Sequence, residues 1–474
     1  MPSFLAYFFF LAFIALGSAA SPPNIVMIIS DDQTYRDFGF MGNNSVYTPH
    51  LDKLATQSAF FPNGYVPTSV CSPSLATILT GLYPHQHGIH YNHPPPGNSA
   101  FNQMKSRNEY ERIRSKSFYL IKSIDTLPRL LTKKGYRSLQ TGKFWEGHHR
   151  NAGFTEGMTV FEPPPGQKFG GVRTLANGEK VAHGNGDWGL KIGRQTMKPI
   201  YNFIDACAGQ SPFFIWYAPY LPHQPHDSPK KYFDLYRNNP KVPKHYIPYY
   251  AAISQFDDTV GNLVNYVEGK GLAENTLFVF VVDNGWTPST RRHKTQKNFF
   301  HHTRESKRAP FEDGLRTPIL FRWDKHITPA QHELLCSSVD IAPTLLHLTG
   351  QSQKAKALPG INLLDRATRK RNADRAVFGE IYPGDATSLG HPSRDVAYRW
   401  MRQGNFKLIL PQGNKPWGNY LNKPALFNLA QDPGEKENLH LQASFQTRVK
   451  TMERLLDKWW QPGDDTAIPK PPAN

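Results

Sequence analysis

Four short apolar segments, separated by stretches long enough for helices, set the expected fold of this chain. Each segment is nearly continuous in hydrophobic residues rather than alternating, which is typical of strands buried on both faces of a parallel sheet. A helical repeat of apolar residues between the third and fourth segments predicts a crossover helix. The pattern favours an α/β fold with a large, mainly parallel sheet sandwiched by helices. The expected strands are residues 24–30, 136–141, 212–218 and 276–282, and the crossover helix is 249–268.

The pattern changes after about residue 365. A helix is still expected at 339–348, but short strands and then a terminal helix follow it. This order predicts a smaller α+β domain packed on the first. We therefore expect a large domain over 21–365 and a C-terminal domain over 366–474. The short strands are expected at 397–401, 406–410 and 425–429, and the terminal helix at 445–459.

The first 20 residues read as a signal peptide. An apolar run from Phe4 to Leu16 is followed by small residues at 17–20, which suit a cleavage site. The run is shorter than the roughly 20 residues that a membrane-spanning helix needs, so stable membrane insertion is not expected. The prediction is an exported protein, either periplasmic or secreted.

Cysteine content and charge limit the kind of protein further. Only Cys71, Cys207 and Cys336 are present, so core packing rather than a disulfide framework must hold the chain together. The formal net charge of +17 favours an anionic partner. No zinc-finger spacing, basic heptad helix or RNP-type aromatic run is found, so we expect anionic polysaccharide rather than nucleic acid. Seven Lys or Arg residues against the single Glu305 concentrate positive charge between 291 and 308.

Polar side chains follow each of the four predicted strands. In open parallel sheets, ligands bind in the crevice at the carboxyl ends of the strands, so these side chains are expected to face one cavity. The run at 83–90 could present imidazoles to a sugar or its sulfate, and the alternative is a mobile, solvated loop. The strand-end residues are Asp31 and Asp32, then Lys143, then His223, then Asp283 and Asn284.

The acidic strand ends offer only oxygen ligands, which suit a hard divalent cation such as Ca²⁺ or Mg²⁺. Crowded carboxylates repel one another and need positive charge between them. The alternative is that each pair is an ordinary solvated turn. Asp257 and Asp258 on the crossover helix are expected to be a solvated face, because adjacent helical residues do not converge on one point.

Residues 70–81 predict a short helix, with Pro73 in its first turn and Gly81 as its stop signal. Cys71 is then expected just ahead of the helix N-terminus, where free N–H groups favour negative charge on the residue or on an anionic ligand. The alternative is a buried, inert cysteine.

The sequence around Cys71 resembles the signature of a known family. Cys71-Ser72-Pro73-Ser74, followed by Leu79-Thr80-Gly81, is similar to the type I sulfatase motif Cys-x-Pro-Ser-Arg with its trailing Leu-Thr-Gly. On this and further motifs in the same order, the chain is identified as a member of the formylglycine-dependent type I sulfatases of the alkaline phosphatase superfamily. The further matching segments are 24–33, 135–147, 221–226, 282–285, 307–318, 340–350 and 432–439.

The resemblance implies a function and a set of site residues. The expected activity is hydrolysis of a sulfuric ester, removing sulfate from a sulfated carbohydrate. Cys71 would be oxidised to formylglycine by a formylglycine-generating enzyme, with Lys143, His223 and Lys307 as the other catalytic residues. One Ca²⁺ per chain would be held by Asp31, Asp32, Asp283 and Asn284.

The chain departs from the family pattern at two positions. Leu75 stands where the motif has arginine, and Trp145 stands where the family has a histidine, which His148 or His149 could replace. Two rival functions therefore stay open. One is a phosphatase or phosphodiesterase of the same superfamily, and the other is a catalytically silent protein that binds sulfated polysaccharide.

Overall fold

The computed structural model describes residues 22–161, 172–184, 187–294, 298–413, 417–463 and 465. The predicted signal peptide at residues 1–20 lies outside the described residues. Within them, no helix combines the length and the apolar character needed to cross a membrane.

The four predicted strands are neighbours at the centre of a nine-stranded sheet. They correspond to β1 (Asn24–Ser30), β3 (Arg137–Gly142), β7 (Phe213–Ala218) and β8 (Thr276–Val282). Their order is β8–β1–β7–β3, and each neighbouring pair is parallel. The expectation of a large, mainly parallel sheet is therefore confirmed.

The sheet extends beyond β8 through two strands that the sequence did not indicate. β11 (Arg316–Arg322) pairs antiparallel with β8 and with β2 (Ala59–Tyr65). Each carries a proline, and the register shifts between Thr317 and Ile319, so the apolar pattern is interrupted by residues typical of turns. The sheet is completed by β4 (Glu156–Gly157), β12 (Ala330–Gln331) and β13 (Cys336–Ser337).

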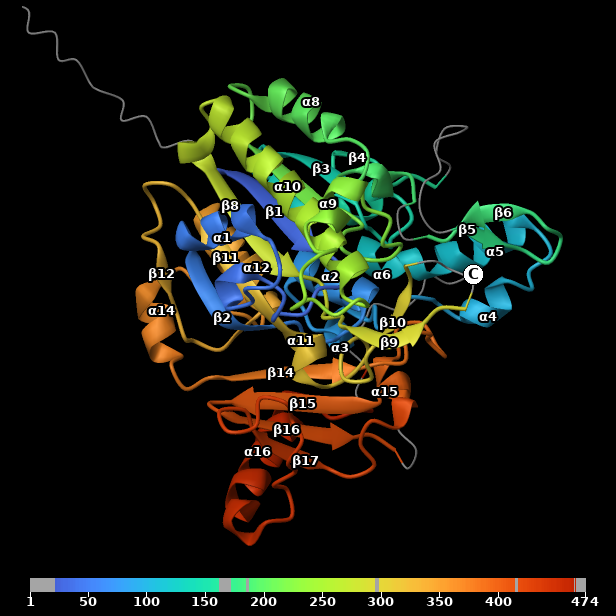
Figure 1. The fold of residues 1–474 in the computed structure, drawn as a ribbon, viewed down its shortest axis with the longest axis vertical. Helices are drawn as coiled ribbons and strands as arrows, with labels where there is room; N and C mark the ends of the chain where they lie inside the picture. Colours follow the sequence, from blue (N-terminus) through green and yellow to red (C-terminus); the bar gives the residue numbers. More distant parts are fainter. Residues whose placement is uncertain are drawn as a thin grey trace, which may run out of the picture.

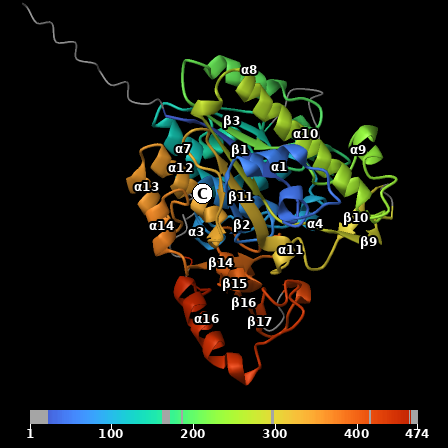
Figure 2. The same ribbon diagram turned by 60° about the vertical axis from the view of Figure 1, so that its left-hand side comes forward.

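Helices cover both faces of this sheet (Figure 2). Ile25, Met27 and Ile29 of β1 belong to the core shared with α2 (Cys71–Thr80), α7 (Leu127–Thr132) and α12 (Ile341–Leu348). The alternate residues, Val26 and Ile28, belong to the core shared with α1 (Pro49–Thr56), α8 (Lys198–Cys207) and α10 (Ile247–Gly269). Because successive strand side chains point to opposite faces, one apolar strand supplies both cores. The predicted crossover helix corresponds to α10.

Shorter elements lie between these layers and around the edge of the sheet. The helices are α3 (Pro84–His87), α4 (Asn98–Phe101), α5 (Arg107–Ser115), α6 (Tyr119–Lys122), α9 (Lys230–Asp234), α11 (Glu312–Leu315), α13 (Ser352–Lys356), α14 (Arg366–Arg371) and α15 (Pro392–Asp395). The strands β5 (Val172–Thr174) and β6 (Lys180–Ala182) form one hairpin, and β9 (Pro288–Arg292) and β10 (Phe300–His302) form another.

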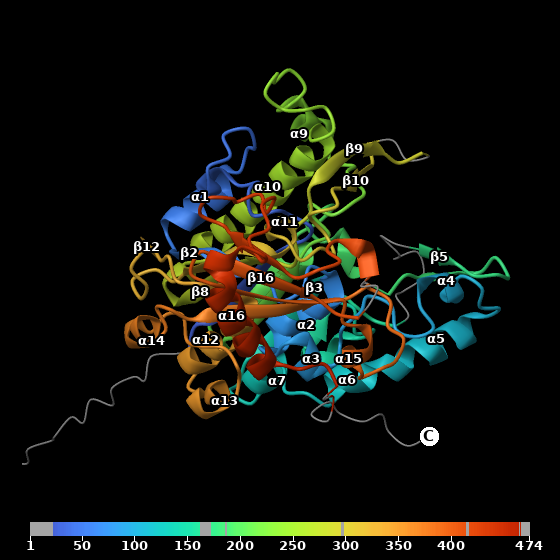
Figure 3. The same cartoon turned by 90° about the horizontal axis from the view of Figure 1, so that it is seen from below.

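A second sheet of four antiparallel strands stands below the first (Figure 1). It comprises β14 (Ala376–Ile381), β15 (Tyr398–Gln403), β16 (Phe406–Pro411) and β17 (Ala425–Asn428). The helix α16 (Gln446–Trp459) lies across its far face, as the view from below shows (Figure 3). The smaller α+β unit is confirmed, whereas its boundary at residue 365 stays a prediction.

Buried contacts between histidines and carboxyl groups join the segment after α2 to the second sheet and to α15. His85 Nδ1 lies 3.0 Å from Glu380 Oε2, and His90 Nε2 lies 2.8 Å from Asp395 Oδ2. His87 contacts the Thr77 hydroxyl inside the core. The hypothesis that this run presents imidazoles to a sugar is therefore wrong, and so is the alternative of a solvated loop, because all three rings are buried and contact other parts of the protein.

The acidic pair on α10 also differs from expectation. Asp257 is buried, and its carboxylate accepts hydrogen bonds from the His50 and Leu51 N–H groups, 3.1 and 2.7 Å away, in the first turn of α1. Asp258 is half-exposed and pairs with Lys231. Asp258 is therefore part of a solvated face, as expected. Asp257 is not, because it caps the N-terminus of α1.

Candidate functional site

The four central strands bring their polar end residues to one edge of the sheet. Asp31 directly follows β1, Lys143 follows β3 and Asp283 follows β8, while His223 lies in the turn after β7. Backbone hydrogen bonds continue the sheet one step further: the Asp31 N–H donates to Leu221 O at 3.0 Å, and the Asp283 N–H donates to Ser30 O at 2.9 Å. The predicted convergence at the carboxyl edge is therefore what the structure shows.

The turn after β3 depends on a glycine. Gly142 has a φ of 71°, and a Cβ atom there would lie 1.8 Å from Ala218 O. Only glycine allows this close approach of the two chains. The following Lys143 N–H donates to the same carbonyl at 2.7 Å, which fixes where the lysine side chain starts.

Two lysines face three buried carboxylates. Lys143 Nζ donates to Asp31 Oδ1 at 2.5 Å and lies 3.4 Å from Asp283 Oδ2. Lys307 Nζ donates to Asp32 Oδ2 at 2.7 Å. With all five groups ionised, the site carries one net negative charge in a largely buried region.

Two oxygens in this cluster have no partner among the described residues. Asp31 Oδ2 and Asn284 Oδ1 are buried without a hydrogen bond. The other atoms of the cluster are engaged: Asn284 Nδ2 donates to Asp32 Oδ1 at 2.7 Å, and Asp283 Oδ1 accepts the Asp32 N–H at 3.0 Å. Buried polar oxygens are rarely left unpaired, and an oxygen-only donor set fits a hard divalent cation.

Burial and the two ammonium groups shift the acidities in opposite directions. Burial raises the pKa of Asp31 well above its usual range, although the Lys143 ammonium opposes the shift. Burial also acts on Asp32, but there the Lys307 ammonium prevails and lowers the pKa of the carboxyl. Burial alone would lower the pKa of Lys143 and Lys307. The Asp31 and Asp32 carboxylates outweigh it, so the pKa of each lysine is raised. Both lysines therefore stay positively charged at neutral pH.

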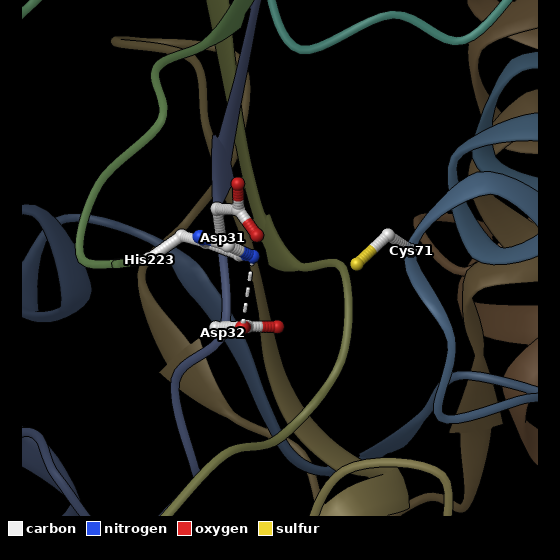
Figure 4. A group of neighbouring side chains, drawn as sticks. All are labelled: Asp31, Asp32, Cys71 and His223. Carbon is white, nitrogen blue, oxygen red and sulfur yellow. Dashed lines mark ion pairs between the residues drawn. The ribbon is translucent and has the colours of Figure 1, made fainter. Parts of the chain in front are cut away.

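Cys71 and His223 complete the group (Figure 4). Cys71 is the first residue of α2, and its sulfur lies with ligand atoms of Asp31, Asp32 and His223 such that all are within 4.8 Å of one another. His223 Nε2 is 3.4 Å from Asp32 Oδ2, while its Nδ1–H donates to Gln224 O at 2.7 Å. Burial raises the pKa of the Cys71 thiol, so the unmodified residue is a weak nucleophile.

The two departures from the family motif have clear structural settings. Leu75, one turn after Cys71, is 5% exposed and packs in the core between α2 and the sheet. Trp145 contacts two histidine rings from other loops, with centroid distances of 5.9 Å to His93 and 5.8 Å to His183. Its Nε1 is buried without a partner among the described residues.

His148 and His149 do not take the place of the lost histidine. Their rings lie 4.3 Å apart, and His149 Nδ1 contacts Thr159 O at 3.2 Å. In the described part of the chain, neither ring has a hydrogen bond or ring contact with Lys143 or Cys71. The imidazoles that contact Trp145 are His93 and His183, which no local motif in the sequence could indicate.

Sequence reasoning also missed residues that border the site. Asn92 Oδ1 accepts the Ser72 N–H at 2.9 Å and so satisfies the start of α2 beside Cys71. Arg308 follows Lys307 directly, and its own N–H donates to Ser69 O at 2.9 Å. The basic run at 291–308 includes Arg308, but nothing in the sequence distinguished it from the other basic residues of that run.

A comparison with protein families decides the relationship. The family model described as sulfatase matches residues 23–351, which is more than half of the chain and includes all eight residues of the predicted site. The chain belongs to the sulfatase family. A second model, described as the C-terminal part of N-sulphoglucosamine sulphohydrolase, matches residues 301–461 of this sulfatase, across β10 to β17 and α16.

Individual proteins similar to this sulfatase cover most of its length. Human N-acetylgalactosamine-6-sulfatase is 28% identical over 88% of this chain and 81% of its own length, and human arylsulfatase A is 28% identical over 90% and 85%. Among solved structures, Ps i-CgsB in complex with k-i-k-neocarrahexaose superposes with a TM-score of 0.66 at 22% identity, covering 95% of this chain and 94% of the other. At this level of identity, the match shows that the two proteins share a fold.

Proposed function

We propose that this sulfuric ester hydrolase removes sulfate from a sulfated carbohydrate by means of a formylglycine at position 71 and one bound Ca²⁺. The observation that carries the proposal is the placement of Cys71 at the start of α2, with its sulfur within 4.8 Å of ligand atoms of Asp31, Asp32 and His223. A cysteine beside carboxylates, a histidine and two lysines is a reacting position rather than a packing position.

Asp31, Asp32, Asp283 and Asn284 would hold the cation. Their unpaired oxygens, Asp31 Oδ2 and Asn284 Oδ1, are the atoms that lack another role among the described residues. A divalent ion would change the net charge of the cluster from −1 to +1, which suits the single negative charge of a sulfate ester. When bound, the ion supplies positive charge to the sulfate oxygens.

Cys71 would be converted by a formylglycine-generating enzyme before the sulfatase is active. A formylglycine hydrate supplies one hydroxyl that attacks sulfur and a second whose collapse releases sulfate. The position of Cys71 at a helix N-terminus places it where N–H groups favour negative charge. The Ser72 N–H is already occupied by Asn92, so this face of α2 is fixed before substrate binds.

The remaining groups would bind and orient the sulfate. The Lys143 and Lys307 ammonium groups are buried and positively charged, so each can stabilise a sulfate oxygen as charge builds up on it. His223 presents Nε2 to the site because its Nδ1–H is held by Gln224 O. It would orient the sulfate or help to protonate the leaving alcohol.

A carbohydrate is the proposed substrate class on two grounds. One similar protein is named N-acetylgalactosamine-6-sulfatase, and another was crystallised with a neocarrahexaose. The chain itself carries a net charge of +17, and Arg291 and Arg292 are exposed on the β9–β10 hairpin, which stands beside α9 (Figure 2; Figure 3). An anionic polysaccharide outside the cell is the partner that this charge fits, and export through residues 1–20 belongs to the same proposal.

Mass spectrometry of the peptide that contains Cys71, on protein from its native host, tests the proposal together with hydrolysis of an aryl sulfate. We expect the mass of formylglycine and a turnover that Cys71→Ala abolishes. Hydrolysis of aryl phosphate but not aryl sulfate would favour the phosphatase alternative. An unmodified cysteine, no turnover, and sulfated-glycan binding that survives Asp283→Ala would instead identify a silent binding protein.

A further inference from the structure

Arg308 is held in a strained backbone conformation between two residues of the site. It follows Lys307, whose ammonium binds Asp32, and its N–H donates to Ser69 O, two residues before Cys71. Its φ is 67°, in the left-handed region that a residue with a long side chain seldom adopts. Such a conformation persists where the surrounding structure holds it, and it is concentrated at functional sites.

The guanidinium of Arg308 has no hydrogen bond or ion pair with any of the described residues. It lies 6.0 Å from the ring centroid of Trp417, and the side chain is half-buried. The neighbouring arginines behave differently: Arg304 donates to the carbonyl of Asn419, and Arg316 donates to Pro62 O at 3.0 Å. A guanidinium has five N–H donors, and those of Arg308 have no acceptor among the described residues. A bound anion would supply the missing acceptor oxygens.

Gly384 makes room for this group. A Cβ atom at Gly384 would lie 3.4 Å from Arg308 Cζ, and the glycine has a φ of 96°. Its carbonyl accepts the N–H groups of Asn92 and His93 at 2.7 and 3.0 Å. The Asn92 side chain binds the Ser72 N–H beside Cys71, so a short series of contacts through Gly384 and Asn92 links the guanidinium to the start of α2.

The charge of Arg308 reaches the groups that line this corner. Burial is the main cause of the lowered pKa of His93, to about 2, and Arg308 is among the cations that lower it further. Burial likewise lowers the pKa of His302, with Lys307 and Arg308 adding to the shift. His93 in turn packs against Trp145 at the motif position. The rings around the guanidinium are neutral, so they do not compete with it for an anion.

We propose that Arg308 forms a second anion subsite, which binds a carboxylate or a second sulfate on the sugar unit that carries the scissile sulfate or on the unit next to it. The inference rests on the proposed function, since it assigns a substrate class to the same cleft. The planar fork of a guanidinium binds both kinds of oxyanion in the same two-point geometry. The substrate is then a sugar with at least two negative charges, only one of which is removed.

Equilibrium binding to the full-length Cys71→Ser protein tests the subsite without turnover or maturation. Calorimetry would compare glucosamine carrying one sulfate, glucosamine carrying two, a monosulfated disaccharide with a uronic acid, and the methyl ester of that disaccharide. Adding Arg308→Gln should weaken binding of a doubly charged sugar by about 10–100-fold and that of the singly charged sugars by about threefold or less, as expected for loss of a charge-assisted contact. A loss confined to the disulfated sugar identifies sulfate as the second group, and a loss confined to the uronate identifies carboxylate.

Matched variants separate recognition from folding. Arg308→Gly suits the left-handed backbone and should behave like Arg308→Gln, whereas Arg308→Lys keeps the charge and should recover part of the affinity. Arg366→Gln, at an exposed residue at the start of α14 with no part in the proposed binding, should leave the ratio of affinities unchanged. Equal losses for singly and doubly charged sugars, or no loss, overturn the subsite while leaving the sulfatase proposal intact. Failure of the Cys71→Ser protein to bind any sulfated sugar, with no aryl sulfate hydrolysis by the natural sequence, overturns both.

Discussion

Leu75 shows how one residue of a family motif can change its role. It lies on α2 one turn after Cys71, but its side chain is 5% exposed and packs among apolar residues between α2 and the sheet. A residue at this position in the motif is expected to be an arginine, whose charge requires a polar partner. Here the Leu75 side chain is part of the core. We therefore expect a substitution of Leu75 to affect first the stability of α2, the helix that carries Cys71.

Leu75→Ala should lower the free energy of unfolding by about 2–5 kcal/mol, because it removes buried methyl groups and leaves a cavity. Leu75→Met keeps the volume and should cost less than about 1.5 kcal/mol. Urea unfolding followed by tryptophan fluorescence measures both changes. If the alanine variant is as stable as the natural sequence, Leu75 is not a packing residue.

Asp283→Asn should remove bound divalent metal while leaving the fold intact. Asparagine keeps an oxygen that can accept the Asp32 and Asn284 N–H groups, but it takes away the charge that faces Lys143. We expect the affinity for Ca²⁺ to fall by more than about tenfold, the lower end of the loss seen when even a supporting carboxylate of a metal site is removed.

The metal content of the Asp283→Asn protein, measured by inductively coupled plasma mass spectrometry after dialysis against a fixed Ca²⁺ concentration, checks this outcome. Asp234→Asn is the control, because this carboxylate is exposed on α9 and, among the described residues, pairs with the nearby Lys230 and Arg237. Unchanged metal content in the Asp283→Asn protein would show that Asp283 is not a ligand.

At the scale of elements, strand ends could be predicted and strand partners could not. β1 and β8 are uninterrupted apolar runs, so their ends, and with them Asp31 and Asp283, followed from the sequence. β2 reads Ala-Phe-Phe-Pro-Asn-Gly-Tyr, and its Pro62 and Gly64 are typical of a turn. Its pairing with β11, β12 and β13, all from a distant part of the chain, makes it a strand. Arg308 and His183 were missed for the same reason, because their neighbours come from other segments.

The loop after β3 contains a carboxyl group that should make stability depend on pH. Burial raises the pKa of Glu146 to about 7, although Arg114 opposes the shift. Because the folded pKa lies above the unfolded value of about 4.3, this group contributes stability that is fully present below pH 4 and is lost as the pH rises through 7. The loss between these limits is about 3–4 kcal/mol for this one group.

Glu146→Gln removes the titrating group and should therefore raise the free energy of unfolding at pH 8 by about 2–3 kcal/mol, with little effect at pH 4.5. Urea unfolding between pH 4.5 and 8.5 measures the difference. Glu274→Gln, at an exposed pair with Lys325, should show no such change. A Glu146→Gln curve parallel to that of the natural sequence would contradict the assignment.

At the scale of the molecule, the two sheets share a buried ionic cluster. Glu312 of α11 accepts hydrogen bonds from the Tyr65 hydroxyl at 2.7 Å and from Lys407 Nζ at 3.1 Å, while Lys407 also lies 2.8 Å from Glu435 Oε1. Tyr65 belongs to β2 of the large sheet and Lys407 to β16 of the second. The segment that carries Lys307 leads directly into α11, so the cluster also anchors the chain that supplies a residue of the site.

Lys407→Met should destabilise the protein by about 3–5 kcal/mol, because it leaves two buried carboxyl groups without their shared cation. Burial already raises the pKa of Glu435 to about 7 with the lysine present, and losing the ammonium would raise it further. The triple change Lys407→Met, Glu312→Gln and Glu435→Gln removes the unpaired charges and should recover part of the loss. Thermal unfolding compares the variants, with Lys450→Met on the exposed side of α16 as the control.

The outcome shows what holds the second sheet in place. If apolar contacts such as Trp400 against Tyr65 hold it, Lys407→Met will unfold at the same temperature as the control. If the cluster couples the sheets, the variant will instead lose resistance to proteolysis between β13 and β14 before the large sheet unfolds, and its kcat will fall with it, because Lys307 is then no longer anchored.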